Sequence, residues 1–365
     1  MSDVPALSGE APLLSIRDLV TVFDTPEGIV RAVSGVSYDV HPGEVVGVVG
    51  ESGSGKSVTA MSLVGLVEQP AGRIVSGRAL FDGEDLLAAS PKRLRQLRGS
   101  QIGFVFQDPM TSLNPVLRVG TQVVEAIRLH DRKISRREAR DRALEVLKLV
   151  GIPNPEKRID QYPFQYSGGM VQRVMLAMAI VHRPRLLIAD EPTTALDPTI
   201  QAQILDVLRE AQRETRAATI LITHDLGLVA EMCDRVVVMY AGRVVESGGV
   251  DQIFHRPRHP YTVGLMASLP RLDGRAERLV PVPGQPPNLV QTPSGCAFHP
   301  RCALRQERLP CVELVPPLAQ IEPGHRSACH FSDEVPTLVA AVARETGVAL
   351  GRDLLVEPAV GEGEA

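Results

Sequence analysis

The stretch Gly50-Glu51-Ser52-Gly53-Ser54-Gly55-Lys56-Ser57 decides the fold of this chain. Its glycines let consecutive backbone N–H groups turn inward around a phosphate, and a helix that follows adds its partial positive charge. The flanks fit this interpretation, because residues 44–49 read as a buried strand and residues 57–64 as a helix. Lys56 would neutralise phosphate charge and Ser57 would place its hydroxyl on Mg²⁺. The sequence therefore predicts a nucleotide-phosphate site between a strand and a helix.

A second apolar run, residues 185–191, ends in two carboxylates, Asp190 and Glu191. Buried carboxylates without a partner would protonate, so this ending indicates a cation or a water molecule at the end of the strand. We expect Asp190 to hold Mg²⁺, directly or through water, and Glu191 to polarise the attacking water. A strand followed by an acidic helix cap is the plainer alternative.

Polar residues also follow two further apolar runs. Gln107 follows residues 102–106 and His224 follows residues 219–223, where a doubly wound sheet presents its loops to a ligand. We expect the Gln107 amide near the Mg²⁺ ion and the water, and His224 near the γ-phosphate, although a lone His at a strand end is more often structural. In this order along the chain, the motifs predict an ATP hydrolase.

The stretch Tyr166-Ser167-Gly168-Gly169-Met170 resembles the signature of ATP-binding-cassette ATPases, with Met170 in place of the usual glutamine. The resemblance implies that Ser167, Gly168 and Gly169 bind the γ-phosphate held by an opposite subunit, so that two cassettes must face each other. It also implies that Phe23 stacks on adenine, with a core aromatic as the alternative. The loop at residues 195–197, with Asp197 at the nucleotide site, would communicate across the dimer.

We therefore expect an α/β fold, a P-loop NTPase cassette in residues 1–250. Its RecA-like core would comprise about residues 12–107 and 184–250, and an inserted helical lobe, about residues 108–183, would meet it at Gln107. Residues 251–332 resemble the C-terminal extension of oligopeptide and dipeptide importer ATPases, with matches at His259-Pro260-Tyr261-Thr262 and Phe298-His299-Pro300-Arg301-Cys302. Residues 333–365 form an acidic tail without a motif, whose end we expect to be disordered.

Four cysteines of this extension, Cys296, Cys302, Cys311 and Cys329, lie in a proline-rich segment and are not explained by core packing. Disulfides are not expected in the reducing compartment where an ATP-consuming protein works. The C-x5-C-x8-C-x17-C spacing lacks the paired knuckles of structural zinc sites, and members of the resembling family carry iron–sulfur clusters. We expect a 4Fe-4S cluster first, zinc second and purely structural thiols third. The fifth cysteine, Cys233, is explained as a small buried side chain beside a strand.

Composition limits the remaining function classes. The chain has 365 residues, 44% apolar and 22% charged, with a formal net charge of -4. We find no apolar run long enough to span a bilayer and no secretory signal at residues 1–5. The basic stretch at residues 132–142 alternates with Asp and Glu, which favours a solvated helix face over a nucleic-acid patch.

The resemblance implies a translocase-class ATPase that energises import of di- and oligopeptides from the cytoplasmic face of the membrane, as a peripheral subunit. Its expected partners are a second ATP-binding cassette subunit, a paralogue, two transmembrane permease subunits and, indirectly, an extracytoplasmic peptide-binding protein, with no nucleic acid. A soluble cassette ATPase of translation or DNA repair is the alternative, but such proteins commonly carry two cassettes or a coiled-coil insertion. A non-enzymatic nucleotide-binding scaffold is opposed by the presence of Glu191 and His224.

Overall fold

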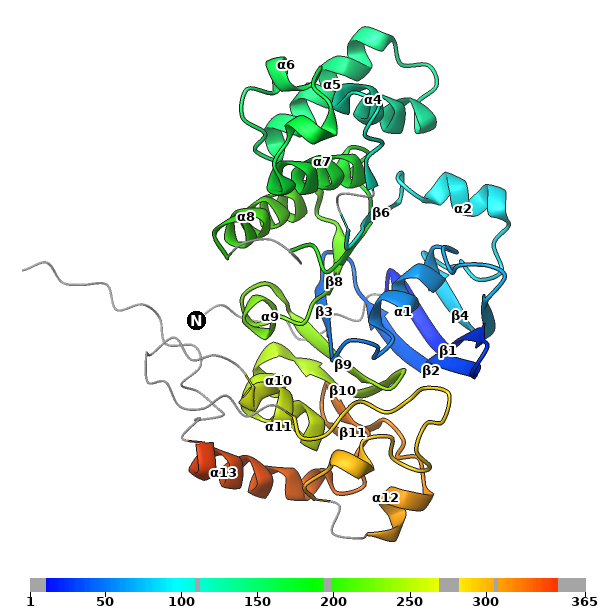
Figure 1. Cartoon of the computed structure of the whole chain (residues 1–365), viewed down its shortest axis with the longest axis vertical. Helices are drawn as coiled ribbons and strands as arrows, with labels where there is room; N and C mark the ends of the chain where they lie inside the picture. Colours follow the sequence, from blue (N-terminus) through cyan, green and yellow to red (C-terminus); the bar gives the residue numbers. More distant parts are fainter. Residues whose placement is uncertain (1–10, 109–111, 194–197, 269–281, 305–307, 347–365) are drawn as a thin grey trace, which may run out of the picture.

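The computed structural model describes residues 11–108, 112–193, 198–268, 282–304 and 308–346. An eight-stranded sheet in the order β11-β12-β10-β9-β3-β8-β7-β6 forms its centre (Figure 1). Its strands are β3 (Val45–Val49), β6 (Ile102–Val105), β7 (Leu186–Asp190), β8 (Ala218–Ile222), β9 (Arg235–Tyr240), β10 (Arg243–Gly249), β11 (Ala319–Glu322) and β12 (His325–Ser327). The five strands from β6 to β9 are parallel, whereas β10, β12 and β11 pair antiparallel.

The parallel strands are those that the apolar runs predict. Every residue of β3, β7 and β8 is buried, as expected for a parallel sheet that is covered on both faces. The predicted helix after the phosphate loop is α1 (Lys56–Leu63), which packs on one face of this sheet. The predicted α/β cassette is confirmed.

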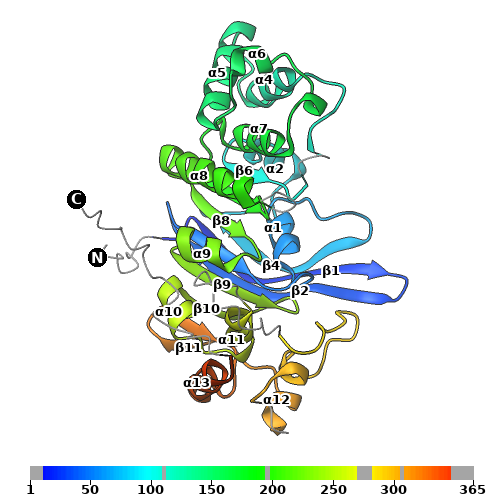
Figure 2. The ribbon, with the colours of Figure 1, turned by 60° about the vertical axis from the view of Figure 1, so that its left-hand side comes forward.

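A second, four-stranded antiparallel sheet covers α1 from the other side (Figure 2). Its order is β2-β1-β4-β5, with β1 (Leu14–Thr25), β2 (Gly28–Val40), β4 (Gly72–Phe81) and β5 (Glu84–Asp85). One apolar core joins the two sheets through α1, and the buried hydroxyls of Thr21 and Ser62 hydrogen-bond at 2.8 Å within it. This sheet is therefore part of the cassette core.

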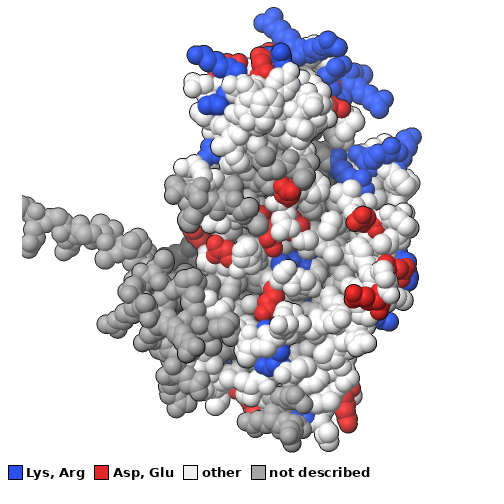
Figure 3. All heavy atoms as spheres, in the orientation of Figure 1, with Lys and Arg blue, Asp and Glu red and all other residues white. Residues whose placement is uncertain are grey.

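Helices between β6 and β7 form the inserted lobe, at the top of Figure 1. They are α4 (Val119–His130), α5 (Arg136–Leu149), α6 (Pro155–Arg158), the 3-10 turn η1 (Pro163–Gln165) and α7 (Gly168–Ile180). Lysine and arginine side chains gather on the surface of this lobe (Figure 3), and those at Arg132, Lys133, Arg136 and Arg137 are exposed, as the alternating charge pattern predicts. The other cassette helices are α2 (Pro91–Leu97), α8 (Pro198–Thr215) and α9 (Leu226–Met232).

The C-terminal extension continues the main sheet. β12 pairs with β10, and β11 pairs with β12, so the boundary expected near residue 250 does not interrupt the sheet. The remaining elements are α10 (Val250–His255), α11 (Pro260–Ala267), η2 (His299–Arg301), α12 (Leu309–Glu313), η3 (Ser332–Glu334) and α13 (Val335–Thr346). α13 lies in the tail for which the sequence predicts no motif. Within the described residues, none of the helices has the length and apolar character that crossing a bilayer requires.

A buried carboxylate joins the extension to the cassette. Glu246 of β10 accepts hydrogen bonds from the backbone N–H groups of Arg258 and His259, at 2.6 and 3.0 Å. Its third partner is Nε2 of His325 in β12, at 2.8 Å, and both side chains of this pair are fully buried. Such a group is costly to leave without its partners, so these contacts hold two segments of the extension against β10.

Replacing Glu246 with alanine should lower the free energy of unfolding by about 3–5 kcal/mol, because it leaves three hydrogen-bond donors, two of them buried, without their acceptor. The chain has no tryptophan, so guanidinium unfolding is best followed by circular dichroism. Glu334→Ala is the matched control, since Glu334 pairs with Arg308 at the surface, and its midpoint should stay near that of the parent chain. Equal midpoints for the two variants would contradict the assignment.

Candidate active site

The phosphate loop connects β3 to α1, and neighbouring strands lie against it. Gly50 and Gly55 have φ angles of 150° and 100°, which other residues rarely adopt. A Cβ atom at Gly50 would collide with the carbonyl oxygen of Met239, and one at Gly55 with that of Ala32. Glycine is therefore required where β9 and β2 approach the loop.

Lys56 is buried and its ammonium group lies inside the loop. Nζ donates to the carbonyl oxygens of Gly50 at 2.8 Å and Glu51 at 3.0 Å. Burial lowers the pKa of Lys56, while the carboxylates of Glu191, Asp190 and Glu51 oppose that shift. A buried cation inside a glycine-rich loop is suited to bind a phosphate chain.

Ser57 and Asp190 meet at the edge of the sheet. The Ser57 hydroxyl donates to Oδ1 of Asp190 at 2.8 Å, so two of the predicted Mg²⁺ ligands lie together. Burial raises the pKa of Asp190, and the hydrogen bond from Ser57 opposes that shift. A hydroxyl and a carboxylate are oxygen donors of the kind that Mg²⁺ takes, and a cation there would relieve the cost of burying the carboxylate.

Gln107, Glu191 and His224 converge at the ends of the adjacent strands β6, β7 and β8. The Gln107 amide donates to Oε2 of Glu191 at 3.0 Å, and Nδ1 of His224 lies 3.6 Å from the same oxygen. The Glu191 side chain is 15% exposed, whereas that of His224 is 66% exposed. The Gln107 and His224 side chains thus flank the Glu191 carboxylate, which can orient and polarise a water molecule.

The backbone at Glu191 has an uncommon conformation. Its φ angle is 46°, in the left-handed region, and its N–H donates to the carbonyl oxygen of Ile222 in β8 at 2.8 Å. Non-glycine residues adopt this conformation at a cost in conformational energy, and residues strained in this way cluster at functional sites. Here the turn ends β7 and directs the carboxylate toward Gln107.

The signature residues open α7. The Ser167 hydroxyl accepts the N–H of Met170 at 3.3 Å, and Gly169 packs so closely against Ile200 that a Cβ atom would lie 2.6 Å from its Cγ2. Met170 packs against the apolar core of the helical lobe, which gives a physical reason for an apolar residue at this position. A helix N-terminus at this position favours a nearby anion.

Two predicted nucleotide contacts lie apart from this cluster in the sequence. Phe23 is half-buried on β1, with its ring against Gly72 of β4, and its stacking on adenine stays a prediction. Asp197, with the rest of the loop at residues 195–197, lies outside the described residues.

Residues of the extension that the sequence did not place near the nucleotide site contact the phosphate loop. Glu51 donates its backbone N–H to the hydroxyl of Tyr261 at 2.7 Å, and its carboxylate pairs with Arg301 at 2.7 Å. The paired residues are 210 and 250 positions apart in the sequence, so local patterns do not predict either contact. The only sequence signal was the position of Tyr261 and Arg301 inside the two matches to importer extensions.

The four cysteines of the extension line one small cavity of about 10 Å³. Burial raises the pKa of Cys296 to about 11 and that of Cys329 to about 12, and nearby thiolates of the group add to both shifts. The N–H of Phe331 donates to Sγ of Cys329 at 3.4 Å. Cys233 lies elsewhere, at the end of α9 against Gly47 of β3.

Among the described residues, no three Cys, His, Asp or Glu side chains have the arrangement of a metal site. The thiols therefore converge on one cavity without standing at ligating distances. Four cysteine side chains that converge on one cavity are still the donor set that a cubane cluster or Cys₄ zinc takes, as thiolates.

Comparison with known families identifies two regions. Residues 33–194 match the family model of the ABC transporter, and residues 245–311 match that of the oligopeptide/dipeptide transporter C-terminal region. The first match contains the phosphate loop, Gln107, the signature and Glu191. The second contains Tyr261, Arg301 and three of the four cysteines.

Several similar proteins match along most of their length. The oligopeptide transport ATP-binding protein OppD of Haemophilus influenzae is 48% identical over 323 residues, which cover 88% of this chain and 98% of the relative. The dipeptide transport ATP-binding protein DppD of Bacillus subtilis is 49% identical and covers 88% of this chain and 95% of the relative. A solved dimer of the ATP-binding cassette MJ0796 with ADP and Pi is 28% identical, with a TM-score of 0.58, and covers 65% of this chain and 98% of that one.

Proposed function

The chain belongs to the ABC transporter ATPases, and from this premise we propose that it powers the import of di- and oligopeptides across the cytoplasmic membrane. Full-length similarity to OppD and DppD, together with the importer-type C-terminal region, supports this assignment. The alternative, a soluble cassette ATPase of translation or DNA repair, is not favoured, because these relatives are peptide transport proteins. We place the chain as a peripheral subunit on the cytoplasmic face of the membrane.

The convergence of Gln107 and His224 on Glu191 is the observation that carries the proposal, and it supports the following residue roles. Lys56 and the loop amides would bind the β- and γ-phosphates, and Ser57, Asp190 and Gln107 would hold Mg²⁺. The ion would offset charge on the phosphates when bound. Glu191 would accept a proton from the attacking water, and Gln107 would orient its carboxylate. His224, whose Nδ1 lies 3.6 Å from that carboxylate, would contact the transferred phosphate.

Two cassettes would complete each site. The loop of one subunit and the Ser167–Gly169 amides of the other would enclose the γ-phosphate, as the motifs imply when each occurs once in the chain. The dimeric form of the similar cassette MJ0796 supports this arrangement. We propose a paralogous second cassette because Met170 departs from the usual glutamine, so the two composite sites of such a pair would differ.

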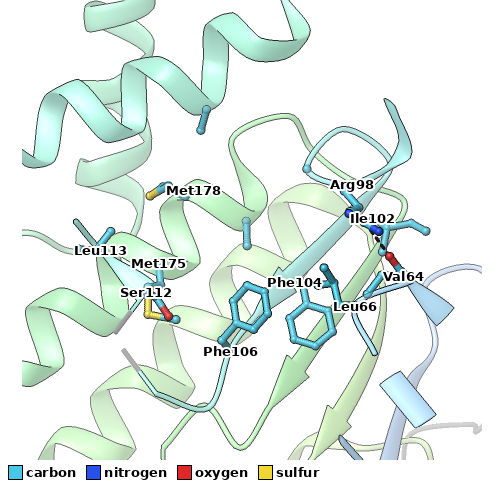
Figure 4. Close-up of a pocket in the computed structure, with 13 residues that line it drawn as sticks. Val64, Leu66, Arg98, Ile102, Phe104, Phe106, Ser112, Leu113, Met175 and Met178 are labelled. Carbon is cyan, nitrogen blue, oxygen red and sulfur yellow. Dashed lines mark hydrogen bonds between the residues drawn. The ribbon is translucent and has the colours of Figure 1, made fainter. Parts of the chain in front are cut away.

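The permease partner would dock in an apolar groove between the core and the helical lobe (Figure 4). The groove has a volume of about 490 Å³, and the rings of Phe104 and Phe106 stand 4.6 Å apart on one side of it. Met175 and Met178 of α7 lie on the other side, and such side chains adapt to a partner helix. Phe106 is 41% exposed and directly precedes Gln107, so an occupant of the groove lies one residue from the catalytic cluster. A peptide-binding protein outside the membrane would act through the permeases.

We assign the four-cysteine cavity to a 4Fe-4S cluster, with zinc as the second choice. Four cysteine sulfurs around one small cavity would provide the ligands, and backbone N–H groups donate to Cys296 and Cys329, an interaction that tunes the sulfurs of bound clusters. When bound, the cluster would cross-link segments of the extension that are far apart in the sequence.

Glu191→Gln should retain ATP binding and lose hydrolysis by at least ~10²-fold, since a positioned general base contributes about 10²–10⁴-fold. Phosphate release and uptake of labelled peptide should fall together in membranes that contain the assembled transporter. Glu231→Gln, at an exposed Glu that pairs with Arg209, is the control and should behave like the parent. A Glu191→Gln transporter that hydrolyses ATP at the parental rate would remove Glu191 from this role.

Phe106→Asp should abolish co-purification with the permease subunits while ATP binding persists, because it places a charge in the apolar groove. The matched control is Phe164→Asp, which changes an exposed phenylalanine of η1 outside the groove. Pull-down of tagged permeases from detergent extracts measures the difference. Retention of the Phe106→Asp subunit would show that the permeases bind another surface.

Anaerobically purified chain should be brown and contain about four iron and four sulfide per chain. Cys302→Ser should bleach the colour, whereas Cys233→Ser should leave it unchanged, because Cys233 lies apart from the cavity. Metal analysis and visible absorbance measure both. A colourless preparation with one zinc per chain would reject the cluster and keep the ligand set.

A further inference from the structure

Glu51, the second residue of the phosphate loop, is bound from outside the cassette core. Nη1 and Nη2 of Arg301 donate to its two carboxylate oxygens at 2.7 and 2.9 Å, a bidentate ion pair. The Arg301 side chain is 4% exposed and that of Glu51 is 25% exposed. A paired guanidinium and carboxylate at this burial interact more strongly than a surface ion pair does.

The surroundings of Arg301 fix its guanidinium in place. Nε donates to the carbonyl oxygen of Pro283 at 2.7 Å, and Nη2 also donates to that of Val282 at 3.2 Å. Nη1 also donates to the hydroxyl of Tyr240 at 3.3 Å. Cζ lies 5.7 Å from the ring centre of Tyr240 and 5.8 Å from that of Phe298. Every N–H direction of the guanidinium therefore has an acceptor, and the ion pair raises the pKa of Arg301.

Glu51 also connects the extension to the lysine that binds phosphate. Its backbone N–H donates to Tyr261, and its carbonyl oxygen accepts from Nζ of Lys56 at 3.0 Å. The Glu51 carboxylate also acts on Lys56 electrostatically, since it opposes the burial-induced fall in the lysine pKa. A carboxylate without its arginine would compete with phosphate for Lys56 and repel the triphosphate.

We propose that Arg301 of the C-terminal extension is a positioning residue of the nucleotide site, which neutralises Glu51 and holds the phosphate loop in its binding conformation. The loop contains Gly50, Gly53 and Gly55, all at positive φ, so an external clamp lowers the entropy lost when the nucleotide binds. Arg301 is the last residue of η2, and Cys296 and Cys302 lie on either side of this turn. The arginine that holds the phosphate loop therefore belongs to the segment that contains the four cysteines. This inference rests on ATP being the ligand of the loop.

The test measures binding of a non-hydrolysable ATP analogue to the full chain by calorimetry. Arg301→Gln should weaken binding about tenfold, equivalent to ~1.4 kcal/mol, and Arg301→Lys should weaken it less. In the Arg301→Gln/Glu51→Gln double variant the unpaired carboxylate is gone, and affinity should return to within about threefold of the parent. Arg308→Gln, which breaks a surface pair in the same extension, is the control and should bind normally.

The KM for ATP in the assembled transporter should rise with the dissociation constant, while kcat changes less than about twofold, since Arg301 does not touch the reacting atoms. Should Arg301→Gln fail to fold, Arg301→Lys and the double variant carry the same comparison. Unchanged affinity in Arg301→Gln, or a double variant as weak as the single one, would overturn the inference. A parent chain that does not bind the analogue would instead reject the proposed function.

Discussion

Parallel pairing of β6, β7, β8 and β3 is the constraint on which the site depends. Val105 lies opposite Ala189, Asp190 opposite Ile222, and Ile222 opposite Val48, so the four strands end at one level. The residues that follow these four strand ends therefore lie close together, although they are far apart in the sequence. A register slip of one residue would turn the side chains at the end of a strand to the other face of the sheet. The all-apolar composition of these strands, which requires burial on both faces, sets their place in the centre.

Much of this arrangement can be predicted from the sequence, because its determinants are local. The glycines of the phosphate loop indicate backbone conformations that other residues rarely adopt, and the end of each apolar run indicates where a buried strand ends. Gln107, Glu191 and His224 are predicted in this way, as polar residues directly after such runs, and the structure places their side chains close together. Local patterning also predicted the helical lobe between β6 and β7.

Contacts between segments that are far apart in the sequence cannot be predicted from local sequence patterns. Nothing in the short segments of β11 and β12 indicates that they extend the main sheet through β10. The partners of Glu51 were equally hidden, since a tyrosine and an arginine in a proline-rich extension are compatible with many surroundings. The left-handed turn at Glu191 was also missed, because non-glycine residues enter that region only where the tertiary structure compels them.

The buried charges explain why the extension and the nucleotide site form one unit. Burial lowers the pKa of Lys56 and raises that of Asp190, so each charged form is disfavoured until an opposite charge arrives. A triphosphate with its cation provides both opposite charges. Glu51 adds a negative charge where the phosphates would bind, and in the described part of the chain this carboxylate pairs with the guanidinium of Arg301. The extension is joined to the sheet by β12 and by Glu246. It thus supplies the positive charge of Arg301, which neutralises the Glu51 carboxylate of the cassette.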